Sequence, residues 1–416
     1  METGQEQVKL RGRAGGRYTA LLATLNLLNY MDRYLVAASL PLIIADLGLS
    51  YAQGAQLVSA FVIGYVIFSP IFGYLGDRWH RPRLMLFGVL IWSAATFGSA
   101  YFHAFWPFIF CRVMVGVGEA SFGTIAPGYI GDLVKDPPKV TRALSIFTAA
   151  IPVGSALAYV VSGVVTSHFS WHHVFLVGAI PGLILGWLLL TLPEVRTAKI
   201  ARDRVPLMVN LRSICATPVL WFAIGGYVGN AFALNGIATF VTQYGTEIGF
   251  NSATISQVFG IALVTTGIIG TMAGGYLSAR LAARAADPIR AMLWFVAITS
   301  AMGVPLVAAA FMSQDHTTFL TLCVLAELCI FAGVGPINSV IVLSAPPGTV
   351  TMTQGLSILA LNLGGALIAP LLIGTLADRF ELGSAMQVTT LGLAIAAIVW
   401  GAGAKFINPQ LRGAKA

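Results

Sequence analysis

Charged residues are scarce in this chain of 416 residues. Asp, Glu, Lys and Arg together make up 10% of it, against roughly 25% in an ordinary soluble domain. Hydrophobic residues make up 57%. This balance excludes an ordinary soluble protein and indicates an integral membrane protein.

Several motifs of pumps and enzymes are also missing. The chain has no GxxxxGK[ST] loop, which excludes an ATP-driven pump built on that loop. It has no HExxH or GxSxG motif, which disfavours a membrane enzyme, while a receptor or channel stays open as an alternative. The four cysteines form no CxxC, and the neighbours His172 and His173 cannot share a helical face. We expect no cofactor and no metal site.

Long apolar runs are what the chain has instead. An apolar stretch of about 20 residues spans a bilayer, and breaks rich in Gly, Pro or charge divide the chain into twelve such runs. The expected fold is all-α, with spans at 18–41, 54–76, 83–102, 106–131, 142–167, 173–192, 218–244, 254–279, 290–312, 317–345, 353–377 and 384–405.

The basic residues give the expected orientation. If the N-terminus is cytoplasmic, only Arg379 lies in an outer loop and only Arg33 and Arg112 lie inside spans, so the other 21 of the 24 Lys and Arg are on the inner side. This agrees with the positive-inside rule and predicts that both termini are cytoplasmic. The net charge of +8 therefore indicates membrane orientation rather than nucleic acid binding.

An internal repeat divides the chain into two halves. GYLGDRWHR at 73–81 recurs as GYLSARLAAR at 275–284, in each case at the inner end of the second span of its half. A basic segment lies between the halves. The predicted organisation is a cytoplasmic tail, a six-helix bundle, a cytoplasmic linker, a second six-helix bundle and a cytoplasmic tail, at 1–17, 18–192, 193–213, 214–406 and 407–416.

The loop after the second span resembles the signature of the major facilitator superfamily, G-x-L-x-D-R-x-G-R-R-R. The matching positions include Gly73, Asp77, Arg78 and Arg81. The resemblance implies two pseudo-symmetric six-helix bundles around a central cavity, alternating access, and a cytoplasmic gate at these four residues. His80 and Pro82 depart from the pattern, and Ala279 replaces the aspartate in the second half, so the gate role is expected only in the first.

Four strings in the first half resemble the Spinster branch of this superfamily. They are NYMDRY, GYLGDR, RVMVGVGEASFGTIAP and LSIFTAAIPVGSALAY, and GVGEAS is the most specific. The resemblance implies transport of sphingosine phosphate or lysophospholipids, driven by protons or otherwise. The second half has no diagnostic motif, so membership is better supported than the substrate.

Four charged residues lie inside the predicted spans of the first half. Arg112 and Glu119 are seven residues apart, which places them near one helical face and about 10 Å apart. Asp32 is expected at the depth of Arg112, and the family fold would bring both spans to the cavity. We predict Glu119, then Asp32, as proton carriers, with Arg112 as the partner that moves, and a structural ion-pair network is the alternative.

The glycines around Glu119 leave room for either close helix packing or an approaching substrate. The second half has one clear intramembrane acid, Glu327, among amides that include Asn235 and Asn362. Together with Arg33 and Arg112, these three residues are the predicted substrate and cavity residues. Each amide alone is more often a contact between helices than a ligand contact.

These observations predict a secondary active transporter of the inner or plasma membrane and no enzyme. Its expected partners are protons, the lipid bilayer and an amphiphilic or anionic small molecule, and we expect a monomer that binds no nucleic acid. A lysolipid or sphingoid substrate would match a cavity with a charged end and an apolar end. The alternative is a proton-coupled carrier of small organic anions or drugs.

Overall fold

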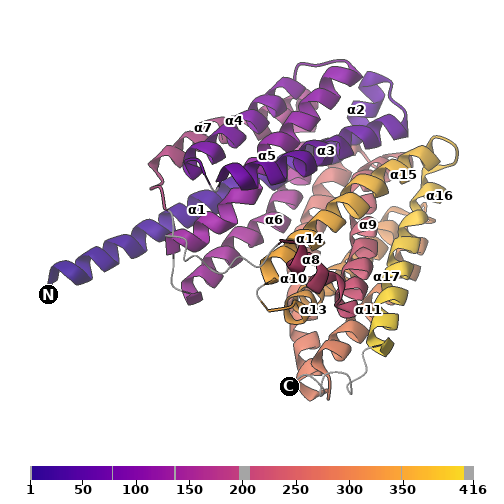
Figure 1. The fold of residues 1–416 in the computed structure, drawn as a ribbon. Helices are drawn as coiled ribbons and strands as arrows, with labels where there is room; N and C mark the ends of the chain where they lie inside the picture. The colour runs from indigo at the N-terminus through magenta and orange to yellow at the C-terminus, as the bar shows by residue number, and fades with distance from the viewer. Residues whose placement is uncertain (1, 77, 135–136, 196–206, 348, 407–416) are drawn as a thin grey trace. The chain divides into compact units, whose positions relative to one another are not determined.

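The structure, a computed structural model, describes residues 2–76, 78–134, 137–195, 207–347 and 349–406 (Figure 1). Within these ranges every regular element is a helix, and there is no strand. Helices are the expected outcome for long apolar runs, because a helix satisfies its own backbone hydrogen bonds where no water is present to do so. The all-α prediction is confirmed.

The described residues of the first half form seven α-helices, one of which continues into a 3₁₀ segment. They are α1 (Glu2–Ala38), α2 (Leu40–Leu47), α3 (Tyr51–Gly76), α4 (Arg81–Ser99), α5 (Phe105–Val134), α6 (Pro137–Thr166) and α7 (His172–Leu185), followed by Gly186–Thr191. Each predicted run of this half corresponds to one helix or to consecutive helical segments. The first predicted run, 18–41, differs most from the observed helix. The helix α1 begins at Glu2 and so includes most of the predicted tail 1–17.

Between residues 207 and 406, the described part of the second half forms ten α-helices and a π-helical segment. They are α8 (Leu207–Cys215), α9 (Pro218–Glu247), α10 (Ser252–Arg284), α11 (Pro288–Ala310), α12 (His316–Ala332), α13 (Val334–Ser344), α14 (Val350–Leu361), the π segment Asn362–Leu367, α15 (Ile368–Ala377), α16 (Leu382–Met386) and α17 (Val388–Phe406). Of the predicted linker, residues 196–206 lie outside the described part of the chain, and α8 overlaps its end.

Local sequence explains where helices begin. Asp287 accepts hydrogen bonds from the backbone N–H groups of Ile289 (3.0 Å) and Arg290 (3.1 Å), and Pro288 follows it at the first helical position of α11. Asp315 caps α12 in the same way through the N–H of Thr318 (2.8 Å). Hydrogen bonds from Thr318 lower the pKa of the Asp315 carboxyl, so this cap is ionised at neutral pH.

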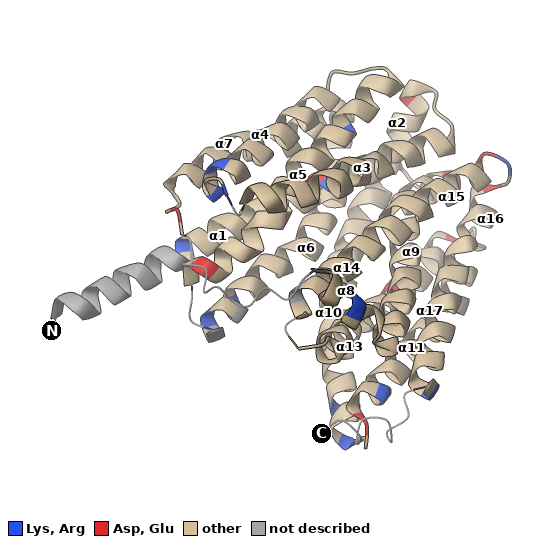
Figure 2. Ribbon diagram, viewed as in Figure 1, with Lys and Arg blue, Asp and Glu red and all other residues tan. Residues whose placement is uncertain are grey.

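Ten helical segments of the described chain are long and apolar enough to cross a bilayer. They correspond to ten of the twelve predicted spans. The other two predicted spans fall on α1 and α4, which are helical but are not among the ten, so the count of twelve stays a prediction. Figure 2 shows that the helices carry few charged residues along their length and that most charges gather near their ends.

Residue contacts divide the chain into two compact units. The first comprises Met1–Leu49, Gln56–Arg202 and Ser252–Ile261, and the second comprises Ser50–Ala55, Asp203–Asn251 and Ala262–Ala416. Within the first unit α1 packs against α6, and α4 packs against both α5 and α7. Within the second unit α17 packs against α9 and α11.

Glycines in α5 allow two neighbouring helices to approach its backbone. A side chain at Gly116 would overlap with the carbonyl oxygen of Phe61 in α3. A side chain at Gly118 would overlap with the backbone of Gly88 and Trp92 in α4. Of the two roles that the sequence left open for these glycines, the structure shows close packing, which is typical of small residues between membrane helices.

We expect Gly116→Ala to destabilise the protein by about 1–3 kcal/mol, because the added methyl group meets backbone atoms that cannot rotate away. The matched control is Gly128→Ala in the same helix, where the methyl group would meet no atom within 4 Å. The measurement is the thermal unfolding midpoint of each purified variant in detergent. Equal midpoints for the two variants would contradict the packing role of Gly116.

Candidate functional site

A buried ion pair joins α1 to α5. The Arg33 Nη2 atom lies 2.6 Å from Glu119 Oε2, and Arg33 Nε donates to the same oxygen at 3.1 Å. The Glu119 side chain is 0% exposed and the Arg33 side chain 12% exposed. Such a pair is expected where two charges are withdrawn from water, because each neutralises the other.

Three aromatic rings surround the Arg33 guanidinium. Its carbon lies 4.7 Å from the centre of the Tyr30 ring, 4.6 Å from that of Phe61 and 5.4 Å from that of Tyr65. Each distance is within the range of a cation–π interaction, which contributes on the order of 0.5–2 kcal/mol. Phe61 and Tyr65 are one helical turn apart on α3, so one face of that helix supplies both rings.

Asp32 and Arg112 are buried beside this pair and are only partly satisfied. Asp32 Oδ2 accepts a hydrogen bond from the Thr96 hydroxyl of α4, while Oδ1 has no hydrogen-bond partner. Arg112 donates one long hydrogen bond, 3.4 Å from Nη2 to the Arg33 carbonyl oxygen, and its Nε and Nη1 atoms have none. Asp32, Arg33, Arg112 and Glu119 all interact electrostatically with one another.

The structure therefore brings together the four charged residues named from the first-half sequence, with one difference in pairing. Glu119 contacts Arg33 and not Arg112, which lies two turns away on the same helix as Glu119 and donates instead to the Arg33 carbonyl oxygen. Among the described residues, Arg112 has no carboxylate oxygen within the 4.0 Å of an ion pair.

The expected gate residues lie at the junction of α3 and α4. Asp77 lies outside the described residues. Arg81 forms an ion pair with Asp132 of α5 and donates from Nε to the Gly76 carbonyl oxygen at 3.1 Å. The Arg78 guanidinium lies over the Tyr74 ring at 3.6 Å, and Gly73 faces α5, where a side chain would touch Thr124.

Sequence reasoning missed two acids of this region. Besides Asp132 at the end of α5, Glu194 accepts a hydrogen bond from the backbone N–H of Arg81 at 3.1 Å. Both acids follow apolar runs, so their sequence signal is only that each lies at the predicted inner end of a span. At the junction of α3 and α4, Arg81 thus contacts carboxylates from two other segments.

The three second-half residues named from the sequence do not contact one another through hydrogen bonds. Asn235 and Asn362 donate to carbonyl oxygens of their own helices, those of Ala231 (2.8 Å) and Ile358 (2.9 Å). Glu327 is buried, and its Oε2 atom accepts from the Thr266 hydroxyl of α10 at 2.7 Å while Oε1 has no partner.

Comparison with protein families and curated proteins gives consistent results. Residues 22–369 match the model of the Major Facilitator Superfamily. The chain is 30% identical over 399 residues to protein spinster homolog 1 of Bos taurus, covering 87% of this chain and 73% of that one. It is 35% identical over 341 residues to a sphingosine-1-phosphate transporter of Mus musculus, covering 76% of this chain and 60% of that one.

A plant relative and two solved structures complete the comparison. A probable sphingolipid transporter of Arabidopsis thaliana is 28% identical over 431 residues, covering 93% of this chain and 86% of that one. The structure of a bacterial homolog of the human lysosomal transporter Spinster, inward-facing and unoccupied, superimposes with a TM-score of 0.82 at 20% identity, covering 94% and 97%. A nucleoside transporter superimposes with a TM-score of 0.73 at 14% identity, covering 93% and 99%.

We expect Arg33→Met to destabilise the protein by about 3–5 kcal/mol, because it leaves the Glu119 carboxylate buried without its partner. The double variant Arg33→Met, Glu119→Leu removes both charges and should regain most of this loss. Thermal unfolding in detergent, followed by the fluorescence of the eight tryptophans, measures both. Arg290→Met at an exposed helix start is the control, and a double variant no more stable than the single one would refute the pairing.

Proposed function

The chain belongs to the major facilitator superfamily and to its Spinster branch, and we propose that it is a proton-coupled carrier of lipid-like amphiphiles that works by alternating access. Its family and its relatives are membrane transporters, so the chain is a multi-pass membrane transporter and not an enzyme. The proposal concerns the driving ion, the substrate class and the residues that perform each task.

The observation that carries the proposal is a set of buried polar atoms without partners in the first unit. Asp32 Oδ1, Glu119 Oε1 and the Nε and Nη1 atoms of Arg112 have no hydrogen-bond partner among the described residues. An unsatisfied buried polar group costs about 1–3 kcal/mol and more when charged, so such groups are rare unless they have a function. Here acceptors and donors are both unsatisfied, which suits a site that binds a proton and an anion.

Formal charge links the two binding events. With both acids ionised, the two acids and two arginines sum to zero. One proton on Glu119 weakens its hold on Arg33 and leaves the group with a net charge of +1, which favours an anionic head group. Arg33, already ringed by aromatic side chains, and Arg112, with unused donors, are the proposed contacts to that head group.

The substrate class is supported by the relatives and by the contrast between the halves. Two relatives are named as transporters of sphingosine-1-phosphate and, probably, of sphingolipids. The described second half has one buried carboxylate, Glu327, and the side chains of Asn235 and Asn362 bond to their own helices, so buried charge is scarce in this half. Asn235, Glu327 and Asn362 are the proposed polar contacts of that half.

The proposed position of the gate follows from the proposed orientation of the chain in the membrane. Twelve spans with both termini cytoplasmic would place the α3–α4 junction on the cytoplasmic side. There Gly73, Asp77, Arg78 and Arg81 form the proposed gate, and the contacts of Arg81 to α5 and Glu194 support it. We propose that the protein acts as a monomer.

Glu119→Gln should abolish the response of transport to an imposed proton gradient, because the amide keeps the shape of the side chain but cannot titrate. The measurement is uptake into proteoliposomes with and without the gradient. Glu381→Gln is the control, since Glu381 is an exposed acid at the start of α16 that lies outside the proposed site, and it should retain the response. A normal response in the Glu119 variant, with a normal thermal midpoint, would remove this residue from proton coupling.

Counterflow tests the substrate class. Vesicles containing the protein and unlabelled sphingoid phosphate or lysophospholipid should accumulate the same labelled compound, since only a carrier exchanges unchanged substrate across the bilayer. Protein-free vesicles are the control because amphiphiles also dissolve in the membrane. Exchange of short organic anions without exchange of amphiphiles would support the alternative substrate class and overturn the lipid proposal.

A further inference from the structure

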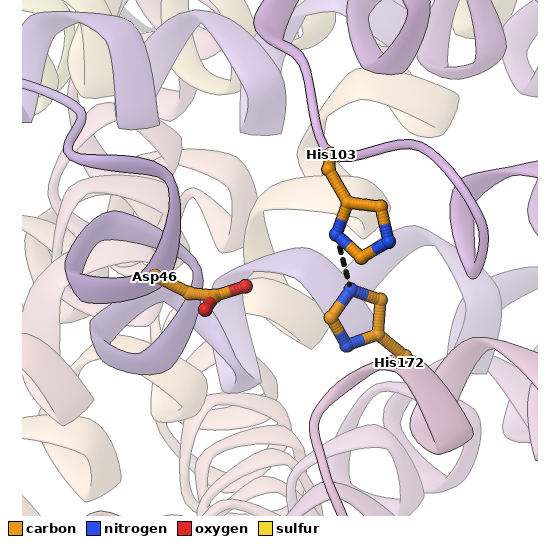
Figure 3. A group of neighbouring side chains, drawn as sticks. All are labelled: Asp46, His103 and His172. Carbon is orange, nitrogen blue, oxygen red and sulfur yellow. Dashed lines mark hydrogen bonds between the residues drawn. The ribbon is translucent and has the colours of Figure 1, made fainter.

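Two histidines and an aspartate meet at one end of the first unit, outside the charged site described above. Asp46 is in α2, His103 is in the loop between α4 and α5, and His172 is the first residue of α7. One potential ligand atom from each lies within 4.8 Å of the other two, and Figure 3 shows the carboxylate directed toward the imidazole pair. All three side chains are exposed or partly exposed, so ions in water can reach them.

We propose that these three residues form a binding site for a divalent transition metal of the Zn²⁺ type. Two imidazoles and a carboxylate are a typical Zn²⁺ donor set, with water in the fourth position. Hard cations such as Mg²⁺ and Ca²⁺ prefer oxygen ligands and are not expected here.

The distance between the histidines suits this geometry. In a tetrahedral site with metal–nitrogen distances of about 2.0–2.1 Å, two ligand nitrogens lie roughly 3.3–3.4 Å apart. The His172 Nε2 atom is 3.3 Å from His103 Nδ1. A hydrogen bond between the rings would also give this distance, and what favours a metal is that an Asp46 oxygen lies within 4.8 Å of both nitrogens.

Neighbouring groups hold two of the ligands in position. The Ser170 hydroxyl lies 2.7 Å from Nδ1 of His172, so its oxygen can accept a hydrogen bond from Nδ1–H and leave the Nε2 lone pair for a metal. Trp171 donates from Nε1 to Asp46 Oδ2 at 3.1 Å. Trp171 is itself buried and stacks on Phe108, which fixes the donor that orients the carboxylate.

The sequence predicts no metal site, because the two histidines that are adjacent in it, His172 and His173, cannot share a helical face. His103 is 69 residues away and comes to His172 only through the packing of α4 against α7. A bound cation would join three segments at this end of the unit, which the proposed orientation places outside the cell. Since binding to the folded state alone stabilises it, the metal should raise the unfolding midpoint.

The test uses the purified full-length protein with no polyhistidine tag. Zn²⁺ should raise the thermal midpoint and Mg²⁺ and Ca²⁺ should not, while Co²⁺ should give the visible absorption of a tetrahedral complex. His103→Ala should weaken Zn²⁺ binding, measured by calorimetry, by roughly 100-fold or more, and Ser170→Ala by about 10–100-fold.

The matched control is His168→Ala, an exposed histidine at the same end whose ring contacts Ser167 and lies outside the group. It should bind Zn²⁺ as the unchanged protein does. The proposal is overturned if Zn²⁺ neither binds nor shifts the midpoint, or if His103→Ala and His168→Ala bind it equally. Midpoints without metal show that each variant is folded.

Discussion

The cost of withdrawing charge from water is the constraint on which the first unit depends. A guanidinium and a carboxylate are buried between α1 and α5, and neither can remain there unless the other is present. The aromatic rings of Tyr30, Phe61 and Tyr65 complete the environment of the cation with their negative faces. One ion pair thus joins α1 to α5, and two rings of α3 contact its cation.

Most of the fold could be predicted from the sequence because span length and charge scarcity are properties of composition. Every apolar run corresponds to helical segments in the described structure. The observed helix boundaries differ from the predicted span boundaries where a local feature other than hydropathy determines the course of the helix. The helix α1 begins before the apolar run, and the predicted span 353–377 is interrupted by the π segment Asn362–Leu367, which no hydropathy pattern marks.

The site was predictable in its members but not in its pairing. Glu119 and Arg112 were found from their spacing on one helix, yet the partner of Glu119 is Arg33 on another helix. Spacing along a helix gives the face and the height of a residue, whereas its partner depends on which neighbouring helix packs at that height, and this information is not in the spacing. Thr96 and Asp132 were missed for the same reason, since each acts through a neighbouring helix.

The π segment between α14 and α15 has a consequence for changes of chain length. A π turn holds about one residue more than an α turn, so the residues after it are rotated by about 100° relative to an uninterrupted α-helix. Loss of one residue from Asn362–Leu367 would restore an ordinary helix there. Elsewhere in a span the same deletion would turn every later side chain of that helix to a new face, so within the spans this segment is the place that accommodates the loss of one residue.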